Sequence, residues 1–289
     1  TPSLTGAAVL LQQHYRDVNG VFMRSATLKG LIIHTADECG ANPGPDYGFG
    51  WGLMNTATAA RTITNNNVTT YIKEEVLDNT QTYTYRVYAD GTRPLMATIC
   101  WTDMPGTPAL PVDNPPDLRL VNDLDLRISD GVTTYMPWVL DPANPGAAAT
   151  RGDNFRDNVE KVFIGAPVAG YYTITVTHKG TLSGGPQPFS IIISEVQCLA
   201  AVNPSPQVSI CQGNGILLQA NAAPGLTYQW QVNGGDLGGE TADAYTASVS
   251  GAYTVVVTRG GCTVTSYPTT VQVDPLTVGG ATATDAFIC

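Results

Sequence analysis

The feature that most constrains the fold is a change in the period of the apolar residues near Thr69. Before this point apolar residues recur every three to four positions, which is the spacing of amphipathic helices. After it they alternate with polar residues in short runs that are rich in β-branched and aromatic side chains, as is typical of strands. The sequence therefore predicts helices first and an all-β region afterwards.

Three helices are predicted within residues 1–65. Ser25 is a candidate N-cap of the second helix, and the third is expected over residues 51–63. The apolar stripe of the first helix consists of Leu4, Ala8, Leu11 and Tyr15. Three helices form only a layer that needs a sheet to cover it, and no strand pattern precedes them.

The β region is predicted to form two sandwiches. Short strand-like runs separated by glycine-containing turns make residues 66–198 a jelly-roll sandwich. Residues 199–274 follow a proline-bearing linker and alternate like an immunoglobulin-like (Ig-like) sandwich with Trp230 in its core. The closing Ala-Phe-Ile-Cys echoes an earlier Val-Ser-Ile-Cys, so residues 275–289 are expected to begin a further, truncated repeat.

Charge and hydropathy exclude two classes of partner. The chain carries 14 Lys and Arg against 24 Asp and Glu, a net charge of −10, whereas nucleic-acid binding requires clustered basic residues. No apolar run reaches the roughly 18 residues of a membrane helix. We therefore expect neither nucleic acid nor a membrane span, and acidity of this kind fits a secreted or cell-surface protein.

Three motifs follow one another in the helical region. The run from Thr1 to Leu11 ends a pattern of the form GTSxAxP and leads into a helix of small residues. Residues 25–36 read SATLKGLIIHTA, and residues 44–55 read GPDYGFGWGLMN. In this order and spacing they resemble the end of the catalytic domain of subtilisin-like serine proteases, so residues 1–65 are expected to be the last, helical part of such an α/β domain.

That resemblance implies peptide-bond hydrolysis by a Ser/His/Asp triad and an oxyanion Asn. All four would precede Thr1, so no catalytic residue is expected within the chain. Without a nucleophile and acid pattern beside them, His14, His34 and His178 are interpreted as packing or surface residues, and Ser3 as merely helical.

Acidic residues mark the predicted jelly roll. They lie in Leu120–Leu126 (LVNDLDL) and residues 152–162 (GDNFRDNVEKV), which resemble the C-terminal jelly roll of certain secreted alkaline subtilases, related in shape to the P-domain of proprotein convertases. Such oxygen ligands suit structural calcium. The candidate ligands are Asp123, Asp125, Asp153, Asp157 and Glu160. The alternative is that these acids cap turns and pair with Arg127, Arg151 or Arg156.

The Ig-like region resembles repeated Ig or PKD-like modules of large secreted Bacteroidetes-type proteins, through its Cys-Gln-Gly, Tyr-Gln-Trp and Gly-Ala-Tyr-Thr-Val pieces. The likeness to antibody domains is architectural only, because no Tyr stands two positions before Cys262. Tyr228, Trp230 and Tyr253 are candidates for a sugar-binding face, but the alternation favours inward, core positions.

Six cysteines allow 15 pairings if all are oxidised. A disulfide between Cys211 and Cys262 is predicted to tie the two ends of the Ig-like sandwich. Cys39 and Cys100 would pair only if the helical layer abuts the jelly roll.

The sequence thus predicts a multidomain, mainly β fragment of a secreted serine endopeptidase. Its partners would be protein or peptide substrates, through the missing catalytic part, and glycans or cell surfaces, through the β domains. The alternative is a non-catalytic secreted adhesin or an array of carbohydrate-binding modules.

Overall fold

A computed structural model of the chain describes residues 2–108, 111–112, 115–196, 199–204, 207–259 and 262–275, with Cys262 described for its backbone alone. The chain is mainly β and divides into two compact units, residues 1–196 and 197–289. The helices and the first sandwich belong to the first unit, and the Ig-like sandwich belongs to the second. The division of the sequence into four domains stays a prediction, and residues 276–289 lie outside the described residues.

The three helices are α1 (Pro2–Asn19), α2 (Ser25–Thr35) and α3 (Thr56–Thr64). Gly20, whose φ is +78°, directly follows the last residue of α1 and stops the helix. Helix α3 begins later than predicted, because the Asn55 side chain accepts a hydrogen bond from the Thr58 N–H and so fixes the N-terminus there. The prediction that Ser25 caps α2 is wrong: Arg24 holds the N-cap position and makes no side-chain cap bond.

The first sandwich consists of two four-stranded sheets with the orders β1-β10-β3-β8 and β2-β9-β4-β5. Their bounds are β1 Tyr71–Leu77, β2 Tyr83–Ala89, β3 Leu95–Trp101, β4 Leu124–Ser129, β5 Thr134–Tyr135, β8 Val159–Ile164, β9 Gly170–His178 and β10 Gln187–Ser194. A short ribbon of β6 (Trp138–Val139) and β7 (Thr150–Arg151) lies outside both sheets. Apart from the β4–β5 hairpin, successive strands of these two sheets alternate between them, as in a jelly roll.

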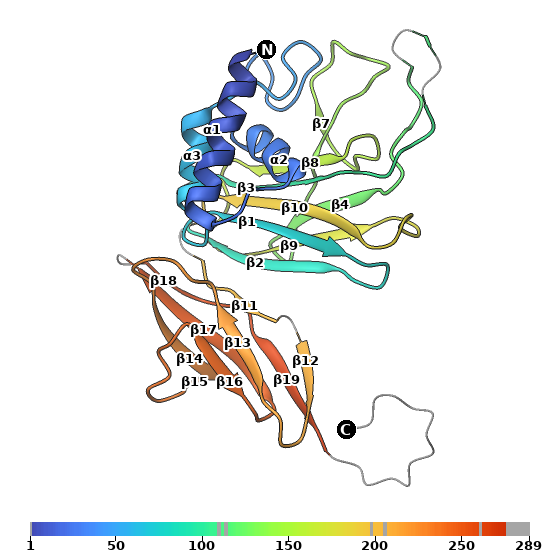
Figure 1. Ribbon diagram of the computed structural model, residues 1–289. Helices are drawn as coiled ribbons and strands as arrows, with labels where there is room; N and C mark the ends of the chain where they lie inside the picture. Colours follow the sequence, from blue (N-terminus) through green and yellow to red (C-terminus); the bar gives the residue numbers. More distant parts are fainter. Residues whose placement is uncertain are drawn as a thin grey trace, which may run out of the picture. The chain divides into compact units, whose positions relative to one another are not determined.

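The helical layer covers one face of the sheet that contains β3 and β10. Figure 1 shows α2 against these strands, with α1 and α3 outside it. Gly30 permits the close approach, because a Cβ there would lie 2.9 Å from Ile192 Cδ1 and 3.2 Å from Cys100 Cβ. Leu31 and Ile63 share one core cluster with Ile192. The sheet that the helices need is therefore the one that follows them in the chain.

The second unit has an immunoglobulin-like strand order, β11-β13-β16 in one sheet and β12-β19-β17-β14-β15 in the other, with β18 beside β17. The bounds are β11 Val202–Asn203, β12 Gln207–Cys211, β13 Ile216–Ala220, β14 Thr227–Val232, β15 Gly235–Asp236, β16 Ala244–Ala247, β17 Gly251–Arg259, β18 Cys262–Thr265 and β19 Thr269–Asp274. These sheets correspond to strands A-B-E and A′-G-F-C-C′ of an Ig fold, with β12 parallel to β19. The predicted Ig-like sandwich is confirmed.

The core of the second unit contains a tyrosine corner that the sequence reading missed. Trp230 is fully buried on β14, as predicted. Tyr253, at the start of β17, donates from its hydroxyl to the Val249 carbonyl at 2.9 Å. Val255, two residues later and fully buried, stands where antibody domains place the second cysteine. A spacing measured back from Cys262 does not indicate this Tyr, because Cys262 lies on β18 and not on β17.

Strand register rules out the predicted pairing of Cys211 with Cys262. Cys211 is level with Asp274 on β19, beyond the Gly251 end of β17, whereas Cys262 pairs with Arg259 at the other end. At about 3.3 Å per residue, β17 alone separates the two levels by roughly 26 Å, and a disulfide requires Cα atoms within about 7 Å. Cys211 is itself disulfide-bonded, with its partner's side chain outside the described residues.

The other cysteine pairing considered from the sequence is also wrong. The helical layer does abut the jelly roll, which was the condition for it, yet Cys39 and Cys100 are both free thiols. Cys100 is buried under α2, and this burial raises the pKa of its thiol to about 11. It therefore acts as a small core residue.

Candidate functional site

Four of the five predicted calcium ligands converge, but they converge on side-chain cations. Lys179 Nζ lies 3.0 Å from Asp123 Oδ2, 3.0 Å from Asp125 Oδ1 and 2.7 Å from Asp153 Oδ2. Arg127 Nη2 lies 2.7 Å from both Asp125 Oδ1 and Asp153 Oδ1. Alternation along β4 puts Asp123 and Asp125 on one side, as the sequence predicted, and that side is occupied by ion pairs.

Glu160 on β8 is the most deeply buried member of this cluster. Its side chain is fully buried, with Oε2 accepting from the Leu126 N–H at 2.5 Å and lying 3.5 Å from Arg127 Nη1. Burial raises the pKa of Glu160 to about 8, in spite of this hydrogen bond and of Arg127. Among the described residues Glu160 Oε1 has no hydrogen-bond partner.

Asp125 and Asp153 share a hydrogen bond, which separates their titrations. Burial, and the hydrogen bond that its protonated form donates to Asp153, raise the pKa of Asp125. Burial alone would raise the pKa of Asp153 too, but its hydrogen bonds to Lys179 and Asp125 lower it. The hydrogen bonds to all three aspartates outweigh desolvation and raise the pKa of Lys179. Lys179 is therefore charged at neutral pH.

The fifth candidate, Asp157, does not join the cluster. It is exposed and accepts a hydrogen bond from Asn154 at 3.2 Å within its own loop. Of the three arginines considered as partners, only Arg127 makes the ion pairs. Arg151 stacks on Trp138 at 3.4 Å from the ring centroid, and Arg156 donates to the Pro116 carbonyl.

Lys179 is the member of the cluster that sequence reasoning missed. It follows the end of β9, where Leu124 is paired with His178, and its N–H donates to the Asp123 carbonyl at 2.9 Å. Only the pairing of β4 with β9 brings it there, because the two residues are 56 positions apart. No local motif marks it.

The cluster does not fit calcium in this arrangement. Calcium needs six to eight oxygen ligands at about 2.3–2.6 Å, and here Arg127 and Lys179 hold the oxygens that face one another. Within the part of the chain that the structure describes, no group of three or more His, Cys, Asp or Glu is arranged to hold a metal. Calcium binding stays a prediction, and the geometry favours the ion-pair alternative.

The asparagine of the LVNDLDL motif has a structural role. Asn122 is buried, and its side chain bonds to Gln187 Oε1 at 2.8 Å and to the N–H and carbonyl of Ser183. Its carbonyl accepts from the Trp101 indole N–H at 3.0 Å. The motif thus ties the closing Pro-Gln-Pro-Phe segment and β3 to the start of β4.

A serine and a histidine meet at the seam between α2 and the sheet, which we call the α2 seam: His34 with Thr98, Ser190 and Ser194. His34 Nε2 lies 2.7 Å from Ser194 Oγ, and Nδ1 lies 2.8 Å from Thr98 Oγ1. Burial and the charge of Lys161 hold the pKa of His34 well below its ordinary value. Because His34 and Ser194 are 1% and 3% exposed, no substrate reaches them. The pair fastens α2 to β3 and β10.

The GPDYGFGWGLMN segment forms a closed loop in front of α3. Asn55 Nδ2 donates to both Asp37 carboxylate oxygens at 2.9 and 3.0 Å, while its Oδ1 caps α3. Gly52 has a φ of +101°, and a Cβ there would lie 2.0 Å from the Asp37 carbonyl oxygen. Asp46 accepts from the N–H groups of Gly48 and Phe49. Asp46, Gly52 and Asn55 of this motif therefore each have a structural role.

Comparison with known proteins gives no family. No family model and no curated protein matches the chain. Solved structures that align with it include the N-terminal four Ig domains of Dscam1 isoform 6.9 (14% identity, TM-score 0.23, 52% of this chain and 38% of that one). Tandem Ig repeats of Dlar align at 12% identity and a TM-score of 0.23, over 68% of this chain and 98% of theirs.

The chain thus spans well under half the length of the Dscam1 structures. The alignment with the Ig1-2 module of the Drosophila receptor protein tyrosine phosphatase DLAR is equally weak, with a TM-score of 0.22. These likenesses are too low to support any statement on function, and the Ig-like description rests on strand order. Across the described residues, no helix has the length and apolarity needed to cross a membrane.

Proposed function

We propose that this chain is the C-terminal part of a secreted, multidomain subtilisin-like serine endopeptidase. The Ser, His and Asp of its triad and the oxyanion Asn lie outside residues 1–289. The parent hydrolyses peptide bonds in protein substrates. This chain supplies the helices behind the nucleophile, a jelly roll that covers them and an Ig-like module.

The observation that carries this proposal is a set of exposed apolar side chains on α1 and the turn that follows it. Only Leu11 and Tyr15 of α1 are buried, whereas Leu4 of the predicted stripe is exposed and Ala8 is half-buried. The exposed large apolar side chains are Leu4, Val9, Leu10, Val18, Val21 and Phe22, which are 44–62% exposed. Val9 and Leu10 lie on other sides of the helix than Leu11, and a helix that is apolar on more than one side is typical of one that packs on more than one side. A further part of the same domain, packed over these side chains, accounts for them.

The three ordered motifs add to this support. In the proposed parent the nucleophile directly precedes α1, so the positive end of the helix faces the developing oxyanion. Gly6 has open space around it, with nothing within 4 Å of a Cβ placed there. Small residues on this turn leave room for close packing beneath a catalytic site.

The test is the coding sequence upstream of Thr1 in the parent gene. We expect a GTSxA motif directly before Thr1, with Asp and His motifs further upstream. The longer protein should then be labelled by a fluorophosphonate probe, and Ser→Ala in that motif should abolish both labelling and peptidase activity. An upstream sequence without these motifs, or a longer protein that the probe does not label, would contradict the proposal.

The 289-residue chain serves as the matched control. The probe should label no serine in it, because Ser194, the serine that is hydrogen-bonded to a histidine among the described residues, is buried and faces His34. Labelling of Ser194 would contradict our interpretation of the α2 seam. The alternative, a non-catalytic adhesin or an array of carbohydrate-binding modules, predicts an upstream region with no protease motif.

A further inference from the structure

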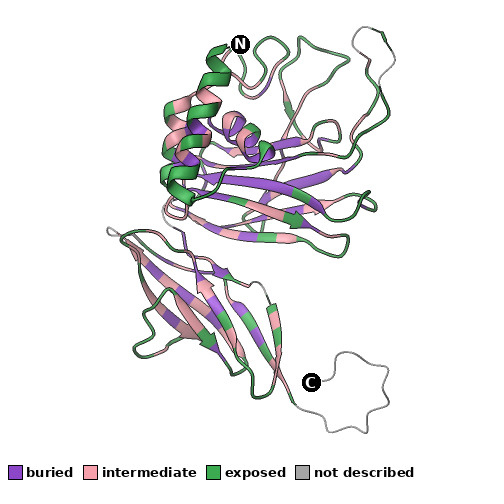
Figure 2. Cartoon of the chain, in the orientation of Figure 1, coloured by how far each residue is buried: buried purple, intermediate pink, exposed green. Residues whose placement is uncertain are grey.

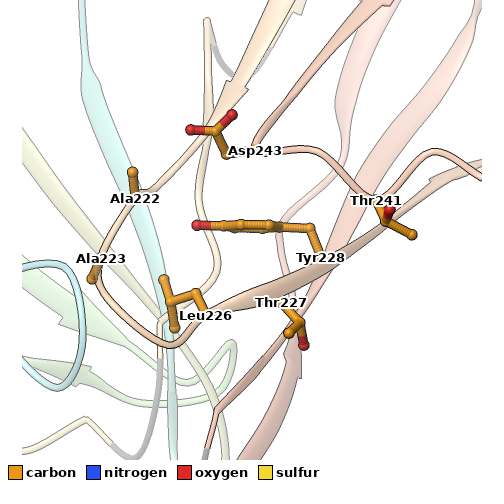
Figure 3. A pocket seen from close by; sticks show the side chains of 7 residues that line it. All are labelled: Ala222, Ala223, Leu226, Thr227, Tyr228, Thr241 and Asp243. Atoms are coloured by element: carbon orange, nitrogen blue, oxygen red, sulfur yellow. The ribbon is translucent and has the colours of Figure 1, made fainter.

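The second unit carries an open pocket of about 760 Å³ at one end of its sandwich. Tyr228, Leu226 and Asp243 line it together with Thr227 and Thr241. Figure 3 shows the Tyr228 ring in the middle of the pocket, with Asp243 on one side of it and Leu226 on the other. Two small residues, Ala222 and Ala223, complete the lining.

Tyr228 differs from Trp230, the other aromatic residue of its strand. Alternation turns it to the same side as Trp230, but Trp230 is fully buried whereas Tyr228, at the start of β14, is only half-buried. Its hydroxyl donates to the Asn221 carbonyl at 3.0 Å, which fixes the ring. Burial and the charge of Asp243 raise the pKa of Tyr228, so the ring is neutral at physiological pH. The expectation of a core residue therefore holds for Trp230 and Tyr253 but not for Tyr228.

Asp243 supplies an acceptor that the protein itself does not use. Its backbone is held in place, because its carbonyl accepts from the Ala220 N–H at 2.8 Å and from Gln219 Nε2 at 2.9 Å. Its side chain is exposed, and no donor among the described residues bonds to the carboxylate. An open carboxylate on a held backbone, beside a ring fixed by its own hydrogen bond, offers two kinds of contact at one place.

We propose that this pocket binds a neutral saccharide. A sugar ring has an apolar C–H face, which stacks on an aromatic ring, and hydroxyl groups at its edge, which donate to a carboxylate in charge-assisted hydrogen bonds. Tyr228, Asp243 and the threonine hydroxyls present these two kinds of contact together. The proposal is independent of the protease proposal, since it concerns the second unit alone.

Charge decides against other ligands. Residues 199–275 contain four carboxylates (Asp236, Glu240, Asp243 and Asp274) and one basic residue, Arg259, a net charge of −3. This charge repels acidic sugars and phosphate groups. An ammonium group would gain only an exposed ion pair and a cation–π contact at one end of the pocket. It would leave the apolar wall and the hydroxyls unused.

The test is isothermal titration of the full 289-residue chain with four neutral hexasaccharides, of glucose, N-acetylglucosamine, mannose and xylose. At least one should bind with a Kd of about 0.1–1 mM. Tyr228→Ala should weaken binding roughly tenfold or more. Tyr228→Phe keeps the ring and should stay within about threefold. Asp243→Asn removes the charge but keeps an acceptor, so it should cost about three- to tenfold.

Tyr267→Ala is the matched control, because Tyr267 is an exposed tyrosine of the same unit that does not line the pocket. It should leave the Kd unchanged. The proposal is overturned if no hexasaccharide binds, or if Tyr228→Ala and Asp243→Asn bind as the wild type does. A tetralysine peptide that binds where the sugars do not would also overturn it.

Discussion

The two sandwiches of this chain differ in how far the faces of their sheets are buried. In the jelly roll, β3 and β10 are buried along almost their whole length, because helices cover one face and the second sheet covers the other. In the Ig-like unit, β17 alternates between buried and half-exposed residues. Figure 2 shows the contrast in the colours of these strands. The stability of a sheet that is buried on both faces therefore depends on the helices as well as on the second sheet.

The cover on the jelly roll is held by polar groups as well as by apolar ones. Besides the His34 contacts, Thr27 Oγ1 lies 2.8 Å from Ser190 Oγ and donates to Glu74 Oε1. Lys161 donates to the carbonyls of Ile33 and His34 at the end of α2. Buried polar groups require their partners, so the strands at the α2 seam are specified for this helix. In the described part of the Ig-like unit, no helix covers either sheet.

The largest effect is expected from Trp230→Ala in the core of the second unit. Removing a fully buried tryptophan should lower the free energy of unfolding by about 3–5 kcal/mol. Chemical denaturation with separate probes for each unit should show the loss in the second unit alone. Trp138→Ala, at a partly exposed tryptophan of the first unit, is the control. A loss shared by both units would break the contrast between them.

Arg127→Met tests the carboxylate cluster of the jelly roll. It removes one of the two positive charges that face Asp125 and Asp153. We expect the free energy of unfolding to fall by about 2–4 kcal/mol, less than for a fully buried pair because Asp153 is partly exposed. Denaturant titration measures it, with Lys179→Met as the more exposed counterpart. Excess chelator should leave the wild-type Tm unchanged. A chelator-dependent fall in Tm would instead support the calcium prediction.

His34→Leu tests the α2 seam. The hydroxyls of Thr98 and Ser194 would lose their partner, at a cost of about 1–3 kcal/mol. The pKa of His34 in the folded state lies well below its ordinary value. Below about pH 6.5 the unfolded state therefore binds more protons than the folded state, so the first unit becomes less stable as the pH is lowered. His34→Leu should remove this part of the acid sensitivity, and His14→Leu should not. An unchanged slope in the His34 variant would contradict this account of the α2 seam.

The smallest effect is expected from Tyr253→Phe, which deletes the tyrosine-corner bond to Val249. The loss should be about 1 kcal/mol in the second unit. Tyr245→Phe is the control, since the two rings are 5.7 Å apart but Tyr245 is not at the corner. Equal losses in the two variants would mean that packing, rather than the hydrogen bond, explains the effect.

Local patterns predicted what depends on neighbours in the sequence. The alternating runs gave both sandwiches, and Trp230 was identified as core. The packing of α2 against β3 and β10 was not predictable, because these strands lie about 65–165 residues further along the chain. The prediction that the apolar stripe of α1 is buried was wrong at Leu4 for a related reason. An apolar position indicates burial only where a partner is present, and the structure leaves Leu4 exposed.

For the candidate sites, too, local patterns predicted one part and contacts distant in sequence decided the other. Alternation placed Asp123 and Asp125 on one side of β4, but only strand pairing adds Lys179, which turns a metal-like pattern into ion pairs. The Cys211–Cys262 pairing failed because spacing along the chain says nothing about which end of a sandwich a strand reaches. Tyr228 and Trp230 face the same side of β14, but Tyr228 lies nearer the start of the strand and is only half-buried.

Whether the helices and the jelly roll form one folding unit is tested most directly by hydrogen exchange on residues 66–289, compared with the full chain. Without the helices, the amides of β3 and β10 should lose protection, because one face of their sheet and the partners of Thr98, Ser190 and Ser194 are gone. The amides of β14 and β17 should keep theirs. Full protection of β3 and β10 in residues 66–289 would contradict the dependence of the jelly roll on its helical cover.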